Sequence, residues 1–171
     1  MNTCCTETAA NRDLTLEFLF LDQTICKPCS GTGRALDEAA EIVAAPLAAL
    51  GTSLEIVRTH VATRSDAIAH RLEISPTLRI DGEDIDPARS EGVCGTCGDL
   101  AGGATTVTCR TWHWRGTEYP AAPTGLIVEA ILKAAVAGTS PSAPEAEGTY
   151  TLPGNLDAFF DARREGRPAC C

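Results

Sequence analysis

The sequence has few basic residues and few aromatic residues. Only 14 Lys and Arg stand against 23 Asp and Glu in 171 residues, which gives a net charge of −9, and aromatic residues make up 5%. No run of Lys and Arg offers the positive footprint that a phosphate backbone requires. We therefore expect no nucleic-acid partner.

Long apolar runs are lacking as well. No stretch approaches the roughly 18 apolar residues of a membrane-spanning helix, and the residues after Met1 lack the basic and apolar regions of a secretory signal. We expect no membrane partner and a cytoplasmic location. The apolar content of 44% suits one compact domain with some tail, whose core needs no help from disulfides.

Cysteine, in contrast, is abundant. The nine cysteines cannot all pair, and they fall into four groups: Cys4 with Cys5, Cys26 with Cys29, Cys94 and Cys97 with Cys109, and Cys170 with Cys171. A reducing cytoplasm gives little support to a structural disulfide framework. Grouped cysteines there are more typical of redox chemistry or of metal binding.

The apolar pattern predicts an α/β domain. Apolar residues alternate where strands are expected and recur at three- or four-residue spacing where helices are expected. Pro46 and Gly51 are expected to kink and to end the first helix. The order is β-α-β-α-β-β-α, and its first half is a parallel unit with right-handed crossovers. The predicted strands are Leu14–Leu21, Leu54–Val61, Ser75–Gly82 and Cys109–Trp114, and the predicted helices are Gly33–Leu50, Arg64–Leu72 and Gly125–Val136.

Composition divides the remaining residues into tails and an insertion. Residues rich in Gly, Asp and Cys stand where a β-hairpin would normally follow the third strand, and they show little periodicity. A last helix is expected to be capped by Asn155, to end at Gly166 and to dock through Leu156, Phe159 and Phe160. The predicted segments are a flexible 1–13, a domain at 14–137 with a Cys-rich insertion at 83–108, a linker at 138–153, and a C-terminal helix and Cys-Cys tail at 154–171.

Cys26 and Cys29 stand between the first predicted strand and the first predicted helix. A helix N-terminus offers unpaired N–H groups and a partial positive charge that stabilise a thiolate, and two intervening residues keep the second thiol within disulfide reach. We expect Cys26 to act as nucleophile and Cys29 to resolve the mixed disulfide. Asp22 is expected to be solvated or to act as a cap, and acceptance of a proton from Cys29 is the alternative. Half of a zinc site and a pair of inert buried side chains are the alternatives.

These motifs carry a resemblance to known families. The strand, the Cys26-Lys-Pro-Cys29 motif, the helix and the later Pro76-Thr77 are similar to the thioredoxin superfamily from about Leu14 to Ala137. The resemblance implies a thioredoxin-like three-layer sandwich. It also implies a cis-proline at Pro76 that faces the dithiol, with Ser75 pairing with the substrate backbone.

A second resemblance is to an uncharacterised bacterial and archaeal family of thioredoxin-like proteins, known only as a domain of unknown function. It implies a fold and leaves the activity open. Three blocks carry it: the strand that runs into Thr24-x-Cys26-x-x-Cys29, the block from Ser75 to Gly82, and Cys94-x-x-Cys97 followed by Cys109-Arg110-x-Trp112.

Cys94, Cys97, Cys109 and His113 have the spacing of a metal site. A tetrahedral zinc could use all four, and the three thiolates alone would suit arsenite or mercury. A disulfide within the set, simply reduced thiols, and a surface strand role for His113 are the alternatives. One of the three cysteines could also exchange with Cys26 as an internal relay.

The adjacent pairs Cys4-Cys5 and Cys170-Cys171 are poorly suited to an internal disulfide, because the ring would be strained. Two neighbouring thiols do chelate soft ions, and a tail could deliver a dithiol to the active site. Incidental cysteines in disordered tails are the alternative.

Thiol-disulfide exchange is the function that the motifs favour, with Cys26, Cys29, Ser75 and Pro76 as its site. It needs no cofactor, and its partner would be a thiol or disulfide protein or a small thiol. One rival is a carrier or detoxification protein for arsenite, mercury or zinc, in which the dithiol binds and never turns over. Another is a zinc-stabilised interaction domain with an inert dithiol.

Overall fold

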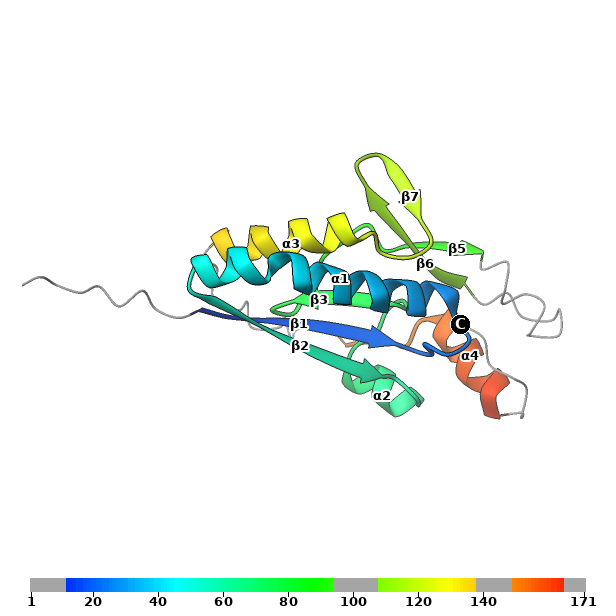
Figure 1. Ribbon diagram of the computed structural model, residues 1–171. Coiled ribbons are helices and arrows are strands. Elements are labelled where there is room, and N and C mark those ends of the chain that lie inside the picture. The colour runs from blue at the N-terminus through cyan, green and yellow to red at the C-terminus, as the bar shows by residue number, and fades with distance from the viewer. Residues whose placement is uncertain (1–11, 94–107, 138–148, 165–171) are drawn as a thin grey trace, which may run out of the picture.

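The computed structural model describes residues 12–93, 108–137 and 149–164 and has a mixed α/β fold. Within these ranges no helix is both long enough and apolar enough to cross a bilayer. Its elements, drawn in Figure 1, are β1 (Arg12–Phe20), α1 (Lys27–Ala49), β2 (Thr52–His60), α2 (Arg64–Ala69), β3 (Thr77–Ile80), β4 (Glu83–Asp84), β5 (Ser90–Val93), β6 (Thr108–Trp114), β7 (Thr117–Tyr119), α3 (Thr124–Ala137) and α4 (Gly154–Arg164).

The larger sheet has four strands in the order β2-β1-β3-β4. β1 runs parallel to β2 in register from Arg12 opposite Thr52 to Phe20 opposite His60, and it runs antiparallel to β3. The prediction of a central first strand is therefore confirmed. A parallel β1-α1-β2 unit requires the long crossover that α1 supplies.

The smaller sheet has three antiparallel strands in the order β5-β6-β7. Arg115 and Gly116, at φ +50° and +75°, form the two-residue turn between β6 and β7. Two consecutive positive φ values match the twist of a tight hairpin. The main-chain N–H of Arg110 in β6 donates to the carbonyl of Ser75 at 3.0 Å, so this sheet is anchored to the loop that enters β3.

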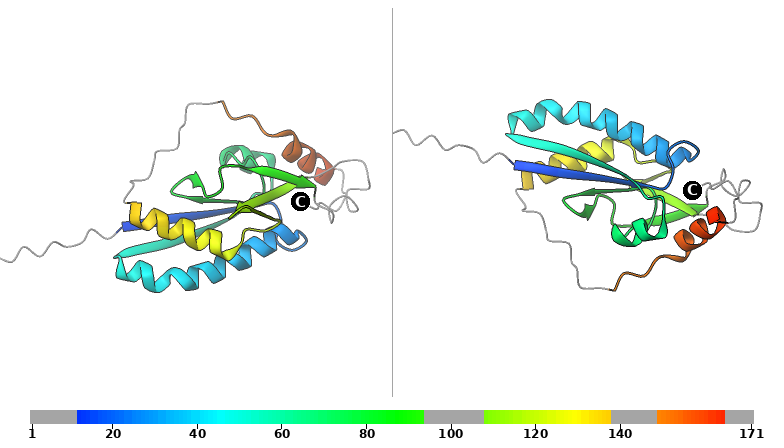
Figure 2. Two further views of the ribbon diagram at one scale, coloured as in Figure 1. Left: turned by 90° about the horizontal axis from the view of Figure 1, so that it is seen from above. Right: turned by 90° about the horizontal axis from the view of Figure 1, so that it is seen from below.

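Helices α1 and α3 lie side by side on one face of the larger sheet, and α2 lies on the other side (Figures 1 and 2). The helical periodicity predicted for both long helices is confirmed by their buried faces, which bury apolar area against the sheet. The core between them, called cluster one here, contains Leu14, Leu16, Phe18, Ala35, Leu36, Ala39, Val43, Leu47, Leu78, Ile80, Trp112, Ala122, Leu126, Ile127 and Ile131.

Helix α1 begins six residues earlier than predicted and continues past Pro46 to Ala49. The earlier start reflects the capping of its first turn by the Cys26 side chain, which sequence periodicity does not register. Gly51 at φ +64° ends the helical segment as predicted, because a left-handed residue costs glycine no Cβ strain.

The prediction of an unstructured insertion starting at residue 83 is wrong for residues 83–93. A hairpin does follow β3 directly, since Asp81 and Gly82 turn at φ +50° and +88° and Glu83 pairs with Ile80. A two-residue strand is too short to show a sequence period. Residues 90–93 form β5, which pairs with β6 far along the chain. Residues 94–107 lie outside the described residues.

Helix α4 docks on the domain, as predicted. Leu156, Phe159 and Phe160 are all buried, at 2%, 1% and 4% exposure. The helix starts at Gly154, so Asn155 is its second residue and not its N-cap; its side-chain oxygen accepts the N–H of Leu156 at 2.8 Å. The predicted end at Gly166 and residues 1–11, 138–148 and 165–171 lie outside the described part of the chain.

Candidate thiol site

A second buried cluster brings together three cysteines that the sequence places in two separate groups. It forms where β1 and β2 end, beneath the first turn of α1, and it is closed by α4 (Figure 1). This cluster, called cluster two here, contains Leu19, Leu21, Cys26, Cys29, Val61, Ala67, Leu72, Cys109, Leu156, Phe159 and Phe160.

Cys26 is the N-cap residue of α1. Its backbone is extended, at φ −76° and ψ 110°, and its sulfur accepts the N–H of Cys29 at 3.3 Å. Pro28 occupies the first turn, where its missing N–H costs nothing. The partial positive charge of the helix N-terminus therefore lies next to the Cys26 sulfur. Such an environment stabilises a thiolate.

Asp22 shapes the loop that leads into this cap. One of its carboxylate oxygens accepts the N–H of Thr24 at 2.6 Å, the hydroxyl of Thr24 at 2.7 Å and the N–H of Ile25 at 3.0 Å. Such side-chain turns fix the backbone locally. The structure thus gives Asp22 a positioning task, in addition to its place near the Cys29 thiol.

The two cysteines of the motif are in different states. Cys26 is disulfide-bonded, whereas Cys29 and Cys109 are thiols. The disulfide of Cys26 therefore involves neither Cys29 nor Cys109.

Cys29 is a fully buried thiol, at 0% exposure. Burial raises the pKa of Cys29 above its ordinary 9.0, because a thiolate loses its hydration there. A hydrogen bond with Ser75 and backbone hydrogen bonds of Asp22 and Leu21 lower this pKa, while the charge of Asp22 raises it. The net direction is upward, so Cys29 is protonated at neutral pH.

Ser75 lies directly against this thiol. Its hydroxyl oxygen is 3.7 Å from the Cys29 sulfur and also accepts the N–H of Leu21 at 3.2 Å. The Ser75–Pro76 peptide bond is cis. Both residues are buried, and the Ser75 carbonyl accepts the N–H of Arg110. Ser75, which the resemblance predicts to pair with the substrate backbone, thus pairs through its carbonyl with β6.

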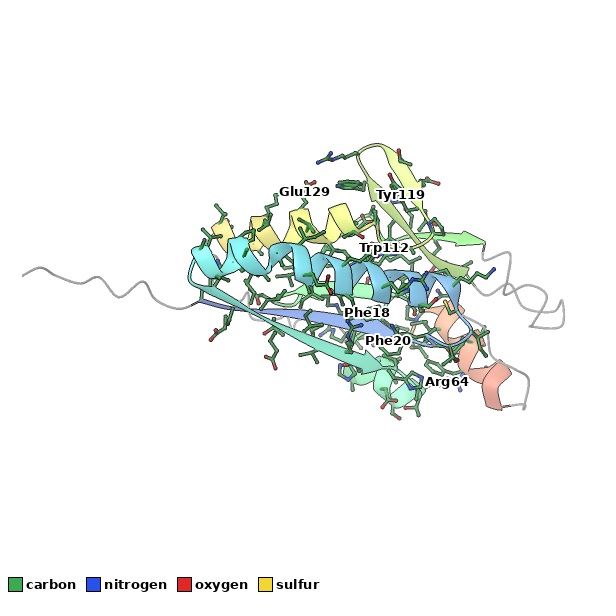
Figure 3. The ribbon with its side chains drawn as sticks, in the orientation of Figure 1. Phe18, Phe20, Arg64, Trp112, Tyr119 and Glu129 are labelled. Atoms are coloured by element: carbon green, nitrogen blue, oxygen red, sulfur yellow. The ribbon has the colours of Figure 1, made fainter. Side chains whose placement is uncertain are left out.

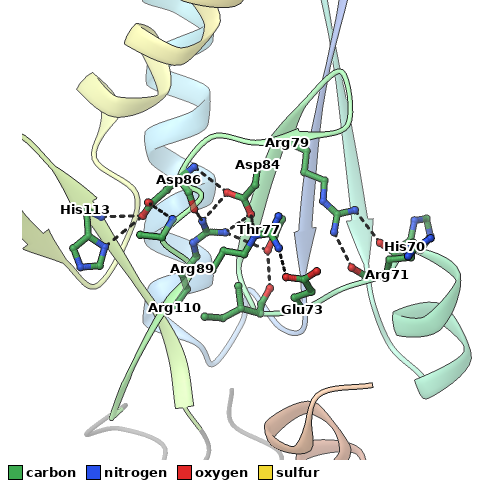
Figure 4. A network of polar contacts seen from close by, with 12 residues as sticks. His70, Arg71, Glu73, Thr77, Arg79, Asp84, Asp86, Arg89, Arg110 and His113 are labelled. Carbon is green, nitrogen blue, oxygen red and sulfur yellow. Dashed lines mark hydrogen bonds and ion pairs between the residues drawn. The ribbon is translucent and has the colours of Figure 1, made fainter. Parts of the chain in front are cut away.

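A buried ion pair behind this loop was not anticipated from the sequence. Arg110 donates to both carboxylate oxygens of Asp84, at 2.8 and 2.6 Å, and its guanidinium lies 3.9 Å from the Trp112 ring centroid. It also donates to Thr77 and to the carbonyl of Asp86 (Figure 4). Bidentate geometry of this kind holds β6 against the β3-β4 hairpin. Nothing local in the sequence marks Arg110 as buried.

Of the four residues proposed as a metal site, the structure describes Cys109 and His113, and it does not bring these two together. Cys109 is in cluster two, whereas the ring of His113 lies between Asp86, at 3.6 Å, and Glu118, at 3.4 Å. His113 is four positions after Cys109 on an extended strand, which puts about 13 Å between their Cα atoms. Cys94 and Cys97 lie outside the described residues.

In residues 12–93, 108–137 and 149–164 no group of three or more His, Cys, Asp or Glu could hold a metal ion. The terminal pairs Cys4-Cys5 and Cys170-Cys171 fall outside these ranges.

Fold and site together define a mixed α/β protein with a buried cysteine site at a helix N-terminus. The family model described as domain of unknown function (DUF2703) matches residues 14–131, and the chain belongs to this family. The expected similarity to a domain of unknown function is thereby confirmed. No curated protein and no solved structure matches the sequence. Cys26, Cys29, Ser75 and Cys109 lie inside the matched region, and α4 lies beyond it.

Proposed function

We propose that the protein is a thioredoxin-like thiol-disulfide exchange protein whose reaction is carried by Cys26 and Cys29. The observation that carries the proposal is the difference between the two sulfurs. Cys26 is in a disulfide at the helix cap, while Cys29, one turn along the same helix, is a thiol. The cap sulfur is the one that forms a disulfide and the buried sulfur is the one kept as a thiol, which supports Cys26 as the attacking and Cys29 as the resolving cysteine.

The reaction follows from this arrangement in two displacements. The Cys26 thiolate attacks one sulfur of a substrate disulfide, the substrate S–S bond breaks, and the departing sulfur leaves as a thiolate that takes up a proton. Cys29 then loses its proton and attacks the Cys26 sulfur, which releases the second substrate thiolate. The dithiol has given two electrons to the substrate and is left as a Cys26–Cys29 disulfide, which an external thiol must reduce.

The surrounding structure supports a division of labour between the two sulfurs. Cys26, at the cap, has the dipole and the N–H of Cys29 to stabilise its thiolate. Burial keeps Cys29 protonated until a mixed disulfide has formed, and the hydroxyl of Ser75 lies where it can support the thiolate that follows. Cys109 shares the cluster, and neither displacement uses it.

The thioredoxin-like part of the proposal is supported by topology. A parallel β1-α1-β2 unit, an antiparallel β3-β4 hairpin and the later helix α3 packed beside α1 follow the order expected of that fold. The cytoplasm is the proposed location, because its reducing thiols would regenerate the dithiol.

A disulfide reductase assay with single-cysteine variants tests the function. Wild-type protein should reduce a model protein disulfide at the expense of an added small thiol, and Cys26→Ser should abolish turnover. Cys29→Ser should also abolish turnover but leave one stoichiometric reaction at Cys26. The matched control is Cys109→Ser, which changes a buried thiol of the same cluster and should retain turnover on an external substrate.

Two outcomes would contradict exchange. Turnover that survives in Cys26→Ser would place the chemistry elsewhere. Wild-type protein that reduces no disulfide but binds arsenite stoichiometrically through its thiols would support the soft-ion carrier instead. Zinc found by elemental analysis of protein purified without chelators would support the zinc-stabilised interaction domain.

A further inference from the structure

The two cysteines proposed to react are closed off from solvent. Cys26 is 2% exposed and Cys29 is 0% exposed. Cysteines that exchange with a partner need access as well as a suitable pKa. Cluster two must therefore open before the proposed exchange can occur, and α4 is the element of that cluster that lies farthest along the chain.

The contact between α4 and the domain has an apolar centre. Phe159 and Phe160 pack edge to face, with ring centroids 5.2 Å apart and planes at 78°, and both are buried with Leu156 in cluster two. On the domain side, Leu72 and Ala67 belong to the same cluster as the cysteines. The surface beneath α4 therefore accepts two adjacent aromatic side chains next to the thiols.

The rim of this contact is charged and exposed. Arg64 of α2 donates to the carboxylate of Asp157 at 2.8 Å and pairs with Asp161 at 2.9 Å, and Figure 3 labels it where α2 meets α4. Asn155 donates to Glu91 at 2.9 Å. Exposed ion pairs contribute little to stability. The polar contacts of the rim thus orient α4, and most of the binding free energy comes from its apolar centre.

The family match gives a second reason to separate α4 from the domain. The matched region ends at residue 131, before α4 begins at Gly154. Cluster two is completed by a helix that the family model does not include. The surface beneath α4 is otherwise built from residues within the matched region.

We propose that the groove filled by α4 is the surface on which a polypeptide disulfide substrate docks, and that α4 occupies it until the substrate displaces it. The groove consists of the domain residues of cluster two with Arg64 at the rim. The fitting partner is a helical segment with two adjacent aromatic residues and with carboxylates placed to meet Arg64, because α4 supplies that combination. This inference rests on the proposed exchange function.

Alkylation of Cys29 in the reduced full-length protein tests whether α4 closes the groove. The double variant Phe159→Ala with Phe160→Ala should raise the iodoacetamide rate at Cys29, located by peptide mass spectrometry, at least about tenfold, because local opening becomes more populated. Circular dichroism should show that the variant remains folded. Asp157→Asn, which removes the charge of one rim contact, should give a much smaller increase.

The matched control is Ile131→Ala, which removes apolar volume from cluster one. Ile131 is as buried as Phe159, at 0% against 1% exposure, but it lies in α3. Its alkylation rate should equal that of wild type, because α4 opens at a lower free energy than the whole domain unfolds. Equal acceleration in Ile131→Ala, or no acceleration in a folded double variant, would overturn the inference.

A labelled synthetic peptide with the sequence of residues 154–164 tests the docking surface directly. It should bind the double variant, whose groove is open, and it should bind wild type at least about tenfold more weakly, because the tethered helix competes. A peptide with both Phe replaced by Ala should not bind the double variant. Failure of the native-sequence peptide to bind that variant would overturn the groove as a docking surface.

Neither readout depends on turnover. Negative alkylation and peptide results with an active reductase would remove the groove and leave exchange intact. Positive results with an inactive reductase would remove exchange and leave the groove as a polypeptide-docking surface.

Discussion

The two buried clusters differ in what they contain and in what closes them. Cluster one is apolar throughout and lies between α1, α3 and the larger sheet. Cluster two holds three cysteines and is closed by α4, a helix beyond the family match. The first has the composition of a core that only needs to be stable. The second has the composition of a functional site, whose cysteines are buried and yet have to be reached by a substrate.

Strand β6 connects the two clusters. Cys109 belongs to cluster two and Trp112 to cluster one, and Arg110 between them is locked to Asp84. The ion pair therefore holds in register a strand that contributes to both cores. Its loss should affect the stability of the whole domain more than any change within one cluster.

The largest expected effect is that of Asp84→Asn. It would leave the Arg110 guanidinium, which is 0% exposed, without its countercharge, and the free energy of unfolding should fall by about 3–5 kcal/mol. Urea denaturation followed by tryptophan fluorescence measures it. Glu83→Gln, at the exposed neighbouring position, is the matched control and should change little. A decrease in the free energy of unfolding that is as small in Asp84→Asn as in the control would contradict a stabilising role for the Arg110–Asp84 ion pair.

Leu36→Ala should show that cluster one serves stability alone. Leu36 is fully buried in α1, and its truncation should cost about 3 kcal/mol. The alkylation rate at Cys29 under native conditions should stay at the wild-type value. A rate that rises as steeply as in the α4 double variant would mean that the two clusters open as one unit.

The pH dependence of unfolding should report the burial of Cys29. Its pKa is raised in the folded state, so the thiol is favoured by folding. The associated stability is complete below pH 9, the ordinary value, and is lost as pH rises from there toward the folded pKa, with a slope of at most about 1.4 kcal/mol per pH unit.

Cys29→Ala should flatten this fall between pH 9 and 10. Tyr150, whose pKa burial also raises, adds a similar fall only above its ordinary value of 10.0, which separates the two groups. The measurement is urea denaturation at a series of pH values. A stability curve that keeps the same slope in Cys29→Ala would assign the effect to another group.

The smallest expected effect is at the start of α2, which carries Arg64 to the rim of cluster two. Thr63 caps this helix by accepting the N–H of Asp66 at 3.1 Å, within a reciprocal capping box. Thr63→Ala should lower stability by about 1 kcal/mol, and Thr63→Ser should restore most of it. Thermal unfolding compares the three proteins. Equal melting temperatures for Ala and Ser would show that the cap contributes nothing.

The sequence predicted the elements whose signal is local. The apolar alternation of β1 and β2, the periodicity of α1 and α3, and the stripe of Leu156, Phe159 and Phe160 each span enough residues to show their period. The position of Cys26 and Cys29 at the start of a helix is equally local, although α1 begins at Lys27 and so already contains Cys29. These predictions agree with the structure because packing reinforces what each segment prefers by itself.

What the sequence did not predict depends on distant partners. β4, β5 and β7 are two to four residues long, and each is defined by the strand that it pairs with. Arg110 and Asp84 are 26 residues apart. The amphipathic pattern of α4 predicted that it would dock, but no pattern within a helix states which surface it will cover.

Trapping of the mixed disulfide tests the role of Cys26 most directly. Reduced Cys29→Ser protein, incubated with oxidised glutathione and digested without reduction, should carry glutathione on Cys26 as a lasting adduct. Wild-type protein should form the same adduct only transiently and end with a Cys26–Cys29 disulfide. A Cys29→Ser protein that carries its glutathione on Cys109, or that forms no adduct at Cys26, would contradict the proposed exchange.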